Sequence, residues 1–267
     1  MADSRGRVLI IAGSDSGGGA GIQADIKTVT ALGGYAATAI TAITVQNTLG
    51  VHGVHAIPPA VVEAQARAVL DDIGADAVKT GMLGDLEMVE RVAAILDTVR
   101  VPVVIDPVMV AKGGSNLLAP GAVDAVRALM IPRATVLTPN APEAEALSGL
   151  PVHTTDNLRR AGERLLDLGA KAVLMKGGHV AGDTVVDVLM TPDGETSFEG
   201  ERLDTRHTHG TGCTLASAVA AGLAQGMPLT EAVARAWAYV HEAMRQAPGF
   251  GAGHGPLDHA WPLRGKA

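Results

Sequence analysis

Several features are scarce in this 267-residue sequence, and each scarcity argues against a class of protein. A single cysteine allows no disulfide within the chain, so we expect a reducing, cytoplasmic compartment. Aromatic residues make up only 2% of the chain and the formal net charge is −7, which argues against nucleic acid as a partner. No apolar run approaches the roughly 18 residues of a membrane span, so we expect no membrane partner.

Apolar residue types are abundant, at 47% of the total, which is enough to bury a large core. Short apolar runs typical of buried strands alternate with amphipathic helical segments along nearly the whole chain. This alternation predicts an α/β fold in which helices cover both faces of a central, mostly parallel sheet. Because no linker, repeat or low-complexity tract interrupts the pattern, we expect one domain spanning residues 1–267.

The predicted strands lie at residues 7–13, 35–45, 76–82, 101–107, 134–140 and 171–178, with a hairpin at 184–204 that turns at Pro192-Asp193-Gly194. The predicted helices lie at 21–32, 58–73, 85–99, 120–130, 158–169, 213–225 and 229–246, and the tail from residue 248 is interpreted as irregular. Ligands of such sheets bind at the carboxyl ends of the strands, so the residues that follow each strand are the candidates for a site.

The stretch GSDSGGGAG, Gly13–Gly21, follows the first predicted strand. It matches neither the dinucleotide-binding glycine pattern nor the P-loop pattern. Two interpretations remain open: a flexible turn between strand and helix, or a loop whose glycines let the backbone approach a ligand closely.

Polar residues also follow three later strands. Asn140 and Glu143, in TPNAPEAEAL, are spaced as a reciprocal helix cap, and their oxygens also suit Mg²⁺ held through water. Asp106 is either a cap or a carboxylate that faces the site. Lys176 ends a buried strand and therefore needs an anionic partner, which is either an acidic side chain or a ligand phosphate.

The only cysteine, Cys213, stands where the glycine turn Gly210-Thr211-Gly212 enters a predicted helix. The exposed backbone amides and the helix dipole at such a turn make an anion hole, and they also lower the pKa of a thiol placed there. Two alternatives are a small buried hydrophobic residue and a metal group formed with His207 and His209.

Taken together, these motifs resemble one known family. The segments AGSDSGGGAGIQADIKT, TAITVQNT, KTGMLG, LTPNAPEAEAL, LMKGGH, HTHGTGCTLASA and GHGPLDH, with IDPVM and AKGG between them, are similar to the bacterial hydroxymethylpyrimidine/phosphomethylpyrimidine kinases of thiamine biosynthesis. The resemblance runs from about Val8 to about His259 and implies a three-layer, ribokinase-like α/β/α fold. It implies transfer of the ATP γ-phosphate to the hydroxymethylpyrimidine and then to its monophosphate, by a cytoplasmic homodimer that uses ATP and Mg²⁺.

The resemblance also assigns roles to residues. The catalytic group would be Cys213, in the place of an aspartate base found in most of the superfamily, together with Gly210, Thr211, Gly212 and Lys176. The pyrimidine would contact Gln46, Gly13, Asp25 and Met82. ATP and Mg²⁺ would bind at Asp106, Asn140, Glu143, Lys176 and His209, with Glu143 organising the metal through water.

Two other functions compete with this one. A pyridoxal kinase of the same family would phosphorylate a pyridine with a similar hydroxymethyl arm, although Gln46 and Met82 favour the pyrimidine. A non-catalytic sensor with the same fold would have no need for the groups on the phosphate side, Asn140, Glu143, Lys176 and Cys213.

Overall fold

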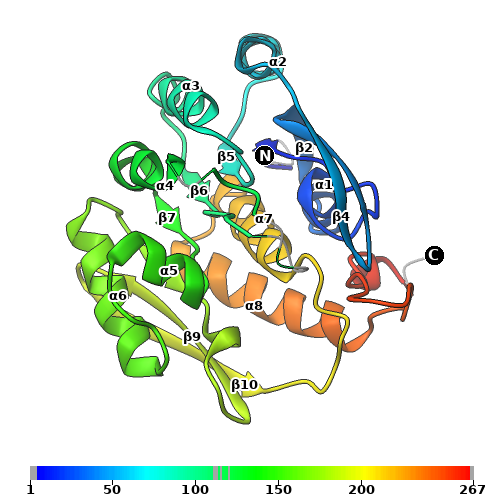
Figure 1. Cartoon of the computed structure of the whole chain (residues 1–267), viewed down its shortest axis with the longest axis vertical. Coiled ribbons are helices and arrows are strands. Elements are labelled where there is room, and N and C mark those ends of the chain that lie inside the picture. The colour runs from blue at the N-terminus through cyan, green and yellow to red at the C-terminus, as the bar shows by residue number, and fades with distance from the viewer. Residues whose placement is uncertain (1–4, 111–113, 115, 120, 265–267) are drawn as a thin grey trace.

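The computed structural model describes residues 5–110, 114, 116–119 and 121–264 (Figure 1). Eight strands form one sheet, in which β8, β7, β6, β5, β1 and β2 pair in parallel and a β9–β10 hairpin adds two antiparallel strands at the β8 edge. In chain order the strands of this sheet are β1 (Arg7–Ala12), β2 (Tyr35–Ile40), β5 (Ala77–Thr80), β6 (Val103–Ile105), β7 (Val136–Leu137), β8 (Val173–Met175), β9 (Thr184–Thr191) and β10 (Gly194–Glu201). The expected mostly parallel sheet is confirmed.

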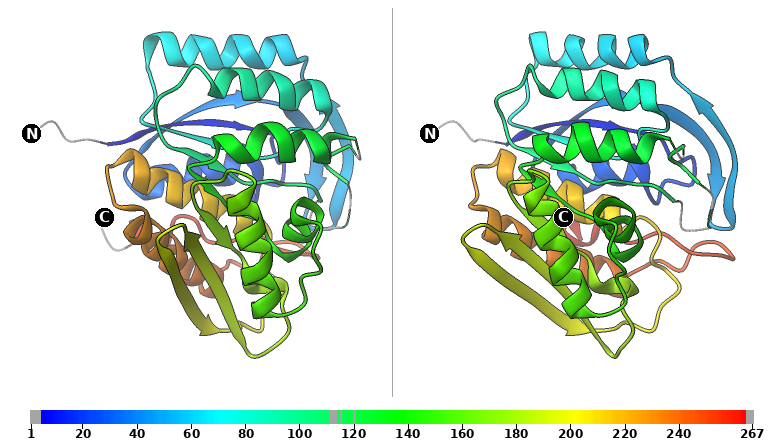
Figure 2. Two further views of the ribbon diagram at one scale, coloured as in Figure 1. Left: turned by 90° about the vertical axis from the view of Figure 1, so that its left-hand side faces the viewer. Right: turned by 60° about the vertical axis from the view of Figure 1, so that its left-hand side comes forward.

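Helices cover both faces of this sheet (Figure 2). Both faces need cover because successive strand residues point to opposite sides and both sets of side chains are apolar. Leu9 and Ile11 of β1 pack into one core, whereas Val8 and Ile10 pack into the other. The first core is closed by α2 (Pro59–Asp72), α3 (Leu86–Leu96), α4 (Ala122–Ala125), α5 (Ala141–Ser148) and α6 (Thr155–Asp167), and the second by α1 (Gly21–Ala31), α7 (Thr211–Ala224) and α8 (Leu229–Arg245). The expected three layers are therefore present.

The predicted strand at 35–45 is wrong, because two strands of different sheets replace it. The chain leaves the main sheet at Thr41, whose amide donates to the Ala12 carbonyl at 3.0 Å and whose hydroxyl donates to the Met82 carbonyl at 2.7 Å. Beyond it, β3 (Ala42–Asn47) pairs only with β4 (Gly50–Ala56), and this hairpin projects past the edge of the main sheet. The sequence analysis missed β4, since GVHGVHA shows no clear alternation of apolar and polar residues.

The predicted helix at 120–130 is shorter and more irregular than expected. After α4 the chain forms a π-helical turn, η1 (Val126–Met130), and a 3₁₀ turn, η2 (Ile131–Arg133), which carries Pro132. Two further 3₁₀ turns are η3 (Gly177–His179) and η4 (Trp261–Leu263). Pro120, and residues 111–113 of the motif that ends at Gly114, lie outside the described residues. Within the described ranges, no helix combines the length and the apolar character needed to cross a membrane.

Candidate active site

A cavity of about 550 Å³ lies at the carboxyl ends of the central parallel strands. We call it the main cavity. All the proposed site residues except Asp25 line it, namely Gly13, Gln46, Met82, Asp106, Asn140, Glu143, Lys176, His209, Gly210, Thr211, Gly212 and Cys213. Segments from one end of the chain to the other therefore meet around one hollow, as the rule for parallel sheets predicts.

The role expected for Asp25 needs correction. Its side chain has no exposed surface and lies beneath the main cavity rather than on its wall. Both carboxylate oxygens accept from Lys79 Nζ, at 2.9 and 3.0 Å, and Ser217 Oγ donates to Oδ1 at 2.6 Å. Burial opposes the charge on Lys79, but the neighbouring acidic groups, Asp25 first among them, together raise the pKa of the lysine above its ordinary value. Asp25 thus anchors a buried cation instead of contacting a ligand.

The helix-cap interpretation of Asn140 and Glu143 is confirmed. Asn140 Oδ1 accepts from the Glu143 amide at 2.9 Å, and Glu143 Oε2 accepts from the Asn140 amide at 2.8 Å. Burial raises the pKa of Glu143 to about 7, although Lys176 acts in the opposite direction. Because both residues also line the main cavity, the cap leaves their metal-organising role open as a proposal.

Lys176 has acidic side chains as its partners. Its Nζ lies 3.0 Å from Asp106 Oδ1 and 3.9 Å from Glu143 Oε2, and only 12% of its side chain is exposed. Burial opposes its charge, but Asp106 and Glu143 together raise the pKa of its ammonium group. Lys176 is therefore a fixed cation at the wall of the cavity.

The other oxygen of Asp106, Oδ2, is buried and has no hydrogen-bond partner among the described residues. An orphaned carboxylate oxygen beside Glu143 suits a hydrated Mg²⁺, which keeps several of its waters. The residues present therefore fit the metal that the family implies. The described residues contain no cluster of three or more His, Cys, Asp or Glu side chains that could hold a metal.

The glycine turn at the start of α7 packs closely against two neighbouring segments. Gly210 is the N-cap, with φ of 84°, and a Cβ added there would overlap the carbonyl of Gly19 in the loop after β1. A Cβ added at Gly212 would lie 3.0 Å from Lys176 Nζ. Only glycines let the positive end of α7 come this close to both the Gly13–Gly21 loop and the lysine.

Cys213 is half-buried in the first turn of α7. Burial raises the pKa of its thiol to about 12, although Lys79 and the Gly21 amide act in the opposite direction. The lowered pKa expected for this thiol is therefore wrong, because burial disfavours the thiolate. The metal alternative with His207 and His209 does not hold either, since these side chains form no such cluster among the residues described.

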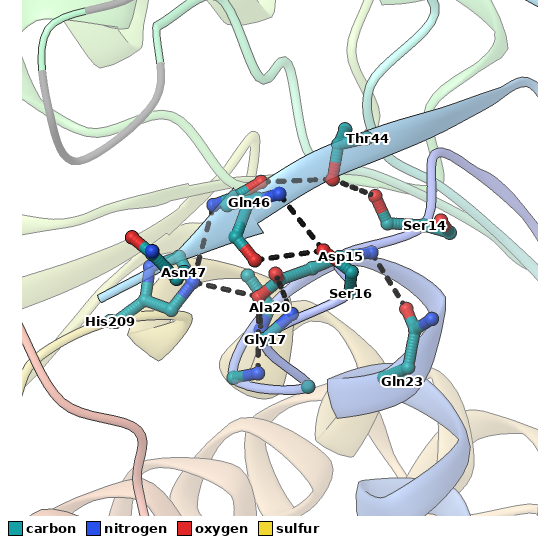
Figure 3. A network of polar contacts seen from close by, with 12 residues as sticks. Ser14, Asp15, Ser16, Gly17, Ala20, Gln23, Thr44, Gln46, Asn47 and His209 are labelled. Carbon is teal, nitrogen blue, oxygen red and sulfur yellow. Dashed lines mark hydrogen bonds and ion pairs between the residues drawn. The ribbon is translucent and has the colours of Figure 1, made fainter. Parts of the chain in front are cut away.

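His209 does not lie where the sequence analysis expected. Its Nε2 is 2.8 Å from Asp15 Oδ2 and 3.4 Å from Gln46 Nε2, so it stands beside the residue expected to read the pyrimidine (Figure 3). Burial opposes ionisation of Asp15, but His209 and the amides of Ala20 and Gly17 hold the pKa of that carboxyl below its usual value. His209 thus lies beside Asp15 and Gln46, and no contact in the described residues joins it to Asp106, Asn140, Glu143 or Lys176.

A second, smaller cavity adjoins the main cavity. It has a volume of about 250 Å³ and shares Asn140, Lys176 and Gly212 with the main cavity. Its other walls include the apolar side chains Val185, Leu203, Leu215, Trp237, Val240 and Met244. We call it the side cavity. The two cavities meet where the fixed cation faces the start of α7.

The sequence analysis missed three charged residues of this region. Lys79 could have been found by the argument used for Lys176, because it too is a lysine in a buried strand. Asp15 lies in the glycine loop, where only the glycines were noticed. Asp187, on the wall of the side cavity, accepts from the Gly177 amide at 2.7 Å and so fixes the turn after Lys176, but nothing in its local sequence marks it.

Comparison with known proteins finds relatives over almost the whole chain. A family model described as phosphomethylpyrimidine kinase matches residues 15–258. A hydroxymethylpyrimidine/phosphomethylpyrimidine kinase of Streptomyces coelicolor is 51% identical over 256 residues, covering 96% of this chain and 95% of that protein. A thiamine biosynthesis bifunctional protein of Geobacter sulfurreducens is 52% identical over 256 residues, which cover 96% of this chain but only 52% of that protein. Bacillus subtilis pyridoxal kinase, solved with ADP, superposes with a TM-score of 0.90 at 39% identity, covering 97% of this chain and 98% of that one.

Proposed function

This chain belongs to the phosphomethylpyrimidine kinase family, and from that premise we propose the two substrates on which it acts. It transfers the γ-phosphoryl group of ATP to the hydroxymethyl oxygen of 4-amino-5-hydroxymethyl-2-methylpyrimidine, and then phosphorylates the resulting monophosphate to the diphosphate. Both reactions serve thiamine biosynthesis, the process named for the Geobacter relative. We also propose that the protein acts in the cytoplasm, because ATP is available there as the phosphoryl donor.

The observation that carries the proposal is the meeting of the two cavities at Lys176 and Gly212. The apolar side cavity suits the base of ATP, and the main cavity suits the acceptor. The phosphoryl group then passes between them, against the α7 amides and the ammonium group of Lys176. Phosphoryl transfer needs mainly alignment and neutralisation of charge, and these are the two things that this junction supplies.

Mg²⁺, when bound, neutralises phosphate charge and orients the donor. We propose that Asp106, Asn140 and Glu143 hold it through water. Asp106 and Glu143 both lie within 4 Å of Lys176 Nζ, at 3.0 and 3.9 Å, and Asn140 is fixed by the cap at the start of α5. Lys176 keeps these acidic groups from repelling the donor, since it offsets their charge.

On the acceptor side, we propose that Gln46 reads the pyrimidine. Its amide can both donate and accept, so it can pair with a ring nitrogen and the 4-amino group together. Met82 packs at Gly13, where a Cβ would lie 2.7 Å from the methionine Cε, and these two residues form the apolar wall for the ring. The acceptor hydroxyl oxygen then lies toward Cys213, and we propose that Cys213 accepts the proton of this hydroxyl group.

A pyridoxal kinase is the competing function, favoured by the close structural match to the Bacillus enzyme. A coupled assay for ADP release with the pyrimidine, its monophosphate and pyridoxal as acceptors separates the two. We expect kcat/KM to be highest with the two pyrimidines. A higher value with pyridoxal would overturn the proposal, and no release of ADP with any of the three acceptors would favour a sensor.

Removing the amide of Gln46 is expected to weaken acceptor binding selectively. In Gln46→Ala the acceptor loses paired hydrogen bonds, so KM for the pyrimidine should rise by the equivalent of about 1–3 kcal/mol while KM for ATP stays constant. Steady-state kinetics with each substrate varied in turn measures both constants. Gln246→Ala, an exposed glutamine at the end of α8, is the matched control. An unchanged pyrimidine KM in Gln46→Ala would remove this residue from the site.

The charge of Glu143 can be removed without removing its cap, because glutamine also completes a capping box. Glu143→Gln is expected to keep its melting temperature and to need more Mg²⁺ for half-maximal rate. With a pKa of about 7, Glu143 is ionised above that pH and protonated below it. The difference in Mg²⁺ requirement between wild type and Glu143→Gln should therefore be large at pH 8 and small at pH 6.

Magnesium titrations of the rate at these two pH values measure the effect. Glu145→Gln is the control, since Glu145 is exposed on the same helix. A lower melting temperature with an unchanged Mg²⁺ requirement would leave Glu143 as a cap alone.

We also propose that the protein is a homodimer. The β3–β4 hairpin exposes Ile43 by 50% and Val45 by 62% on its outer face, and a second copy of this chain would cover them. Sedimentation equilibrium gives the mass in solution, and a mass of one chain would overturn this proposal.

A further inference from the structure

Every second residue between Gly249 and Gly255 is glycine, in the segment GFGAGHG. The sequence analysis treated this tail as irregular, but the close approach of other segments explains three of the four glycines. A Cβ at Gly251 would overlap the Thr48 side chain, one at Gly253 would overlap the Thr48 carbonyl oxygen, and one at Gly255 would overlap the His207 ring. These glycines therefore allow the backbone of this segment to pack directly against Thr48 and His207. We call residues 249–259 the strap.

The strap is bound first to the tip of the β3–β4 hairpin. The Gly253 amide donates to Thr48 Oγ1 at 3.3 Å, and the His254 amide donates to the Thr48 carbonyl at 2.9 Å. Thr48 lies in the turn between β3 and β4, two residues after Gln46. The hairpin is outside the main sheet, so it depends on such contacts for its position.

The strap is bound next to the segment that precedes α7. His254 Nδ1 lies 3.2 Å from the Arg206 carbonyl, and the His209 amide donates to the Gly255 carbonyl at 3.2 Å. These contacts fix the backbone of His209, whose ring lies between Asp15 and Gln46 (Figure 3).

The far end of the strap is anchored in the body of the protein. Leu257 and His259 are buried, and His259 Nε2 lies 2.9 Å from Thr214 Oγ1 in α7. The Tyr239 hydroxyl of α8 donates to the His259 carbonyl at 2.7 Å. The strap thus leads from a rigid anchor beside Cys213 to the tip of a projecting hairpin.

Gln46 lies where these contacts converge. The backbone carbonyl of Gln46 accepts from Ser16 Oγ at 2.7 Å, and the backbone amide of Gln46 donates to the same hydroxyl oxygen at 2.8 Å. The hairpin is therefore also held to the Gly13–Gly21 loop. Two independent attachments, Ser16 and the strap, therefore fix the height of Gln46 above the main cavity.

We propose that the strap is a positioning element for the acceptor, and that Thr48 and Gly253 are positioning residues that hold Gln46 over the main cavity. They touch neither substrate, so they act through the hairpin alone. The kinetic part of this inference rests on the proposed function. The structural part, that the strap holds the hairpin closed, does not.

Gly253→Ala tests the proposal, because the added methyl group would push the strap away from the Thr48 carbonyl. We expect the acceptor KM to rise about tenfold, the size of effect of about one lost hydrogen bond, with the ATP KM unchanged. In the ligand-free protein, hydrogen exchange of the hairpin amides at residues 42–56 should speed up about tenfold while exchange in α7 stays constant. Thr48→Val, which loses the oxygen that accepts from Gly253, should show the same pattern more weakly. Thr48→Ser, which keeps a hydroxyl oxygen at that position, should behave like the wild type.

Gly121→Ala is the control, since a Cβ there meets open space and its φ of −71° suits any residue. Faster exchange confined to the hairpin, with a selective rise in acceptor KM, supports the inference. Unchanged hairpin exchange in both Gly253→Ala and Thr48→Val overturns it, as does an equal rise in both Michaelis constants. If the wild-type protein phosphorylates none of the three acceptors, the proposed function fails and the exchange measurement still decides whether the strap holds the hairpin.

Discussion

Lys176→Met is expected to lower kcat by roughly 10²–10³ and to raise KM for ATP, the range seen when one stabilising group is taken from a charged transition state. The ammonium group lies 3.0 Å from Asp106 and 3.9 Å from Glu143, where the two cavities meet. Without it, two acidic side chains face the incoming phosphates with no protein cation between them. The change therefore removes the attraction between the lysine and the phosphates, and it leaves the repulsion between the phosphates and the two carboxylates uncompensated.

Steady-state kinetics with ATP and acceptor varied separately measures this effect. Lys171→Met is the control, because Lys171 is exposed at the opposite end of β8. Lys176→Arg should recover little activity, since a planar guanidinium cannot place its charge at the point that the compact ammonium group occupies beside Asp106 and Glu143. Activity of Lys176→Met within threefold of wild type would show that the lysine is only a partner for Asp106.

The fold could be predicted from the sequence wherever hydrophobic periodicity decides the structure. Strands such as β1 and β8 are buried on both faces, and their apolar runs identify them directly. The periodicity fails at Thr41, where the apolar run continues but the chain changes sheets. That change is fixed by hydrogen bonds to Ala12 and Met82, which are distant in sequence, so no local pattern could reveal it.

The site was predicted in outline for a similar reason. Parallel strands bring their carboxyl ends together, so polar residues after each strand converge on one cavity whatever their separation in sequence. The sequence does not show in which direction each side chain points in the folded protein. Asp25 lies in a motif that resembles the family, yet its side chain turns inward to Lys79, and His209 turns toward Asp15 instead of Lys176.

The pKa of Cys213 is the most instructive difference between the sequence and the structure. A thiol in the first turn of a helix suggests an activated nucleophile or base. In the folded protein, burial and the neighbouring carboxylates of Asp25 and Asp106 raise the pKa of that thiol to about 12, against the effect of Lys79. Cys213 is therefore a protonated thiol at neutral pH. If it accepts the proton of the acceptor hydroxyl, it must first lose its own.

Cys213→Ala is accordingly expected to lower kcat by about 10²-fold, the low end of the general-base range, with little change in either Michaelis constant. The effect is modest for a base because the loose transition state of phosphoryl transfer asks little of the group that takes the proton. Wild-type kcat should rise with pH from 7 toward 10, since the reactive thiolate forms only as the pH approaches the raised pKa. Cys213→Asp, whose carboxyl group ionises at lower pH than the thiol, should recover part of the rate with a profile that levels off at lower pH. The kcat–pH profiles of the three proteins decide the role: a flat wild-type profile, with Cys213→Ala within threefold of wild type, would show that the thiol only packs and that the α7 amides and Lys176 carry the chemistry.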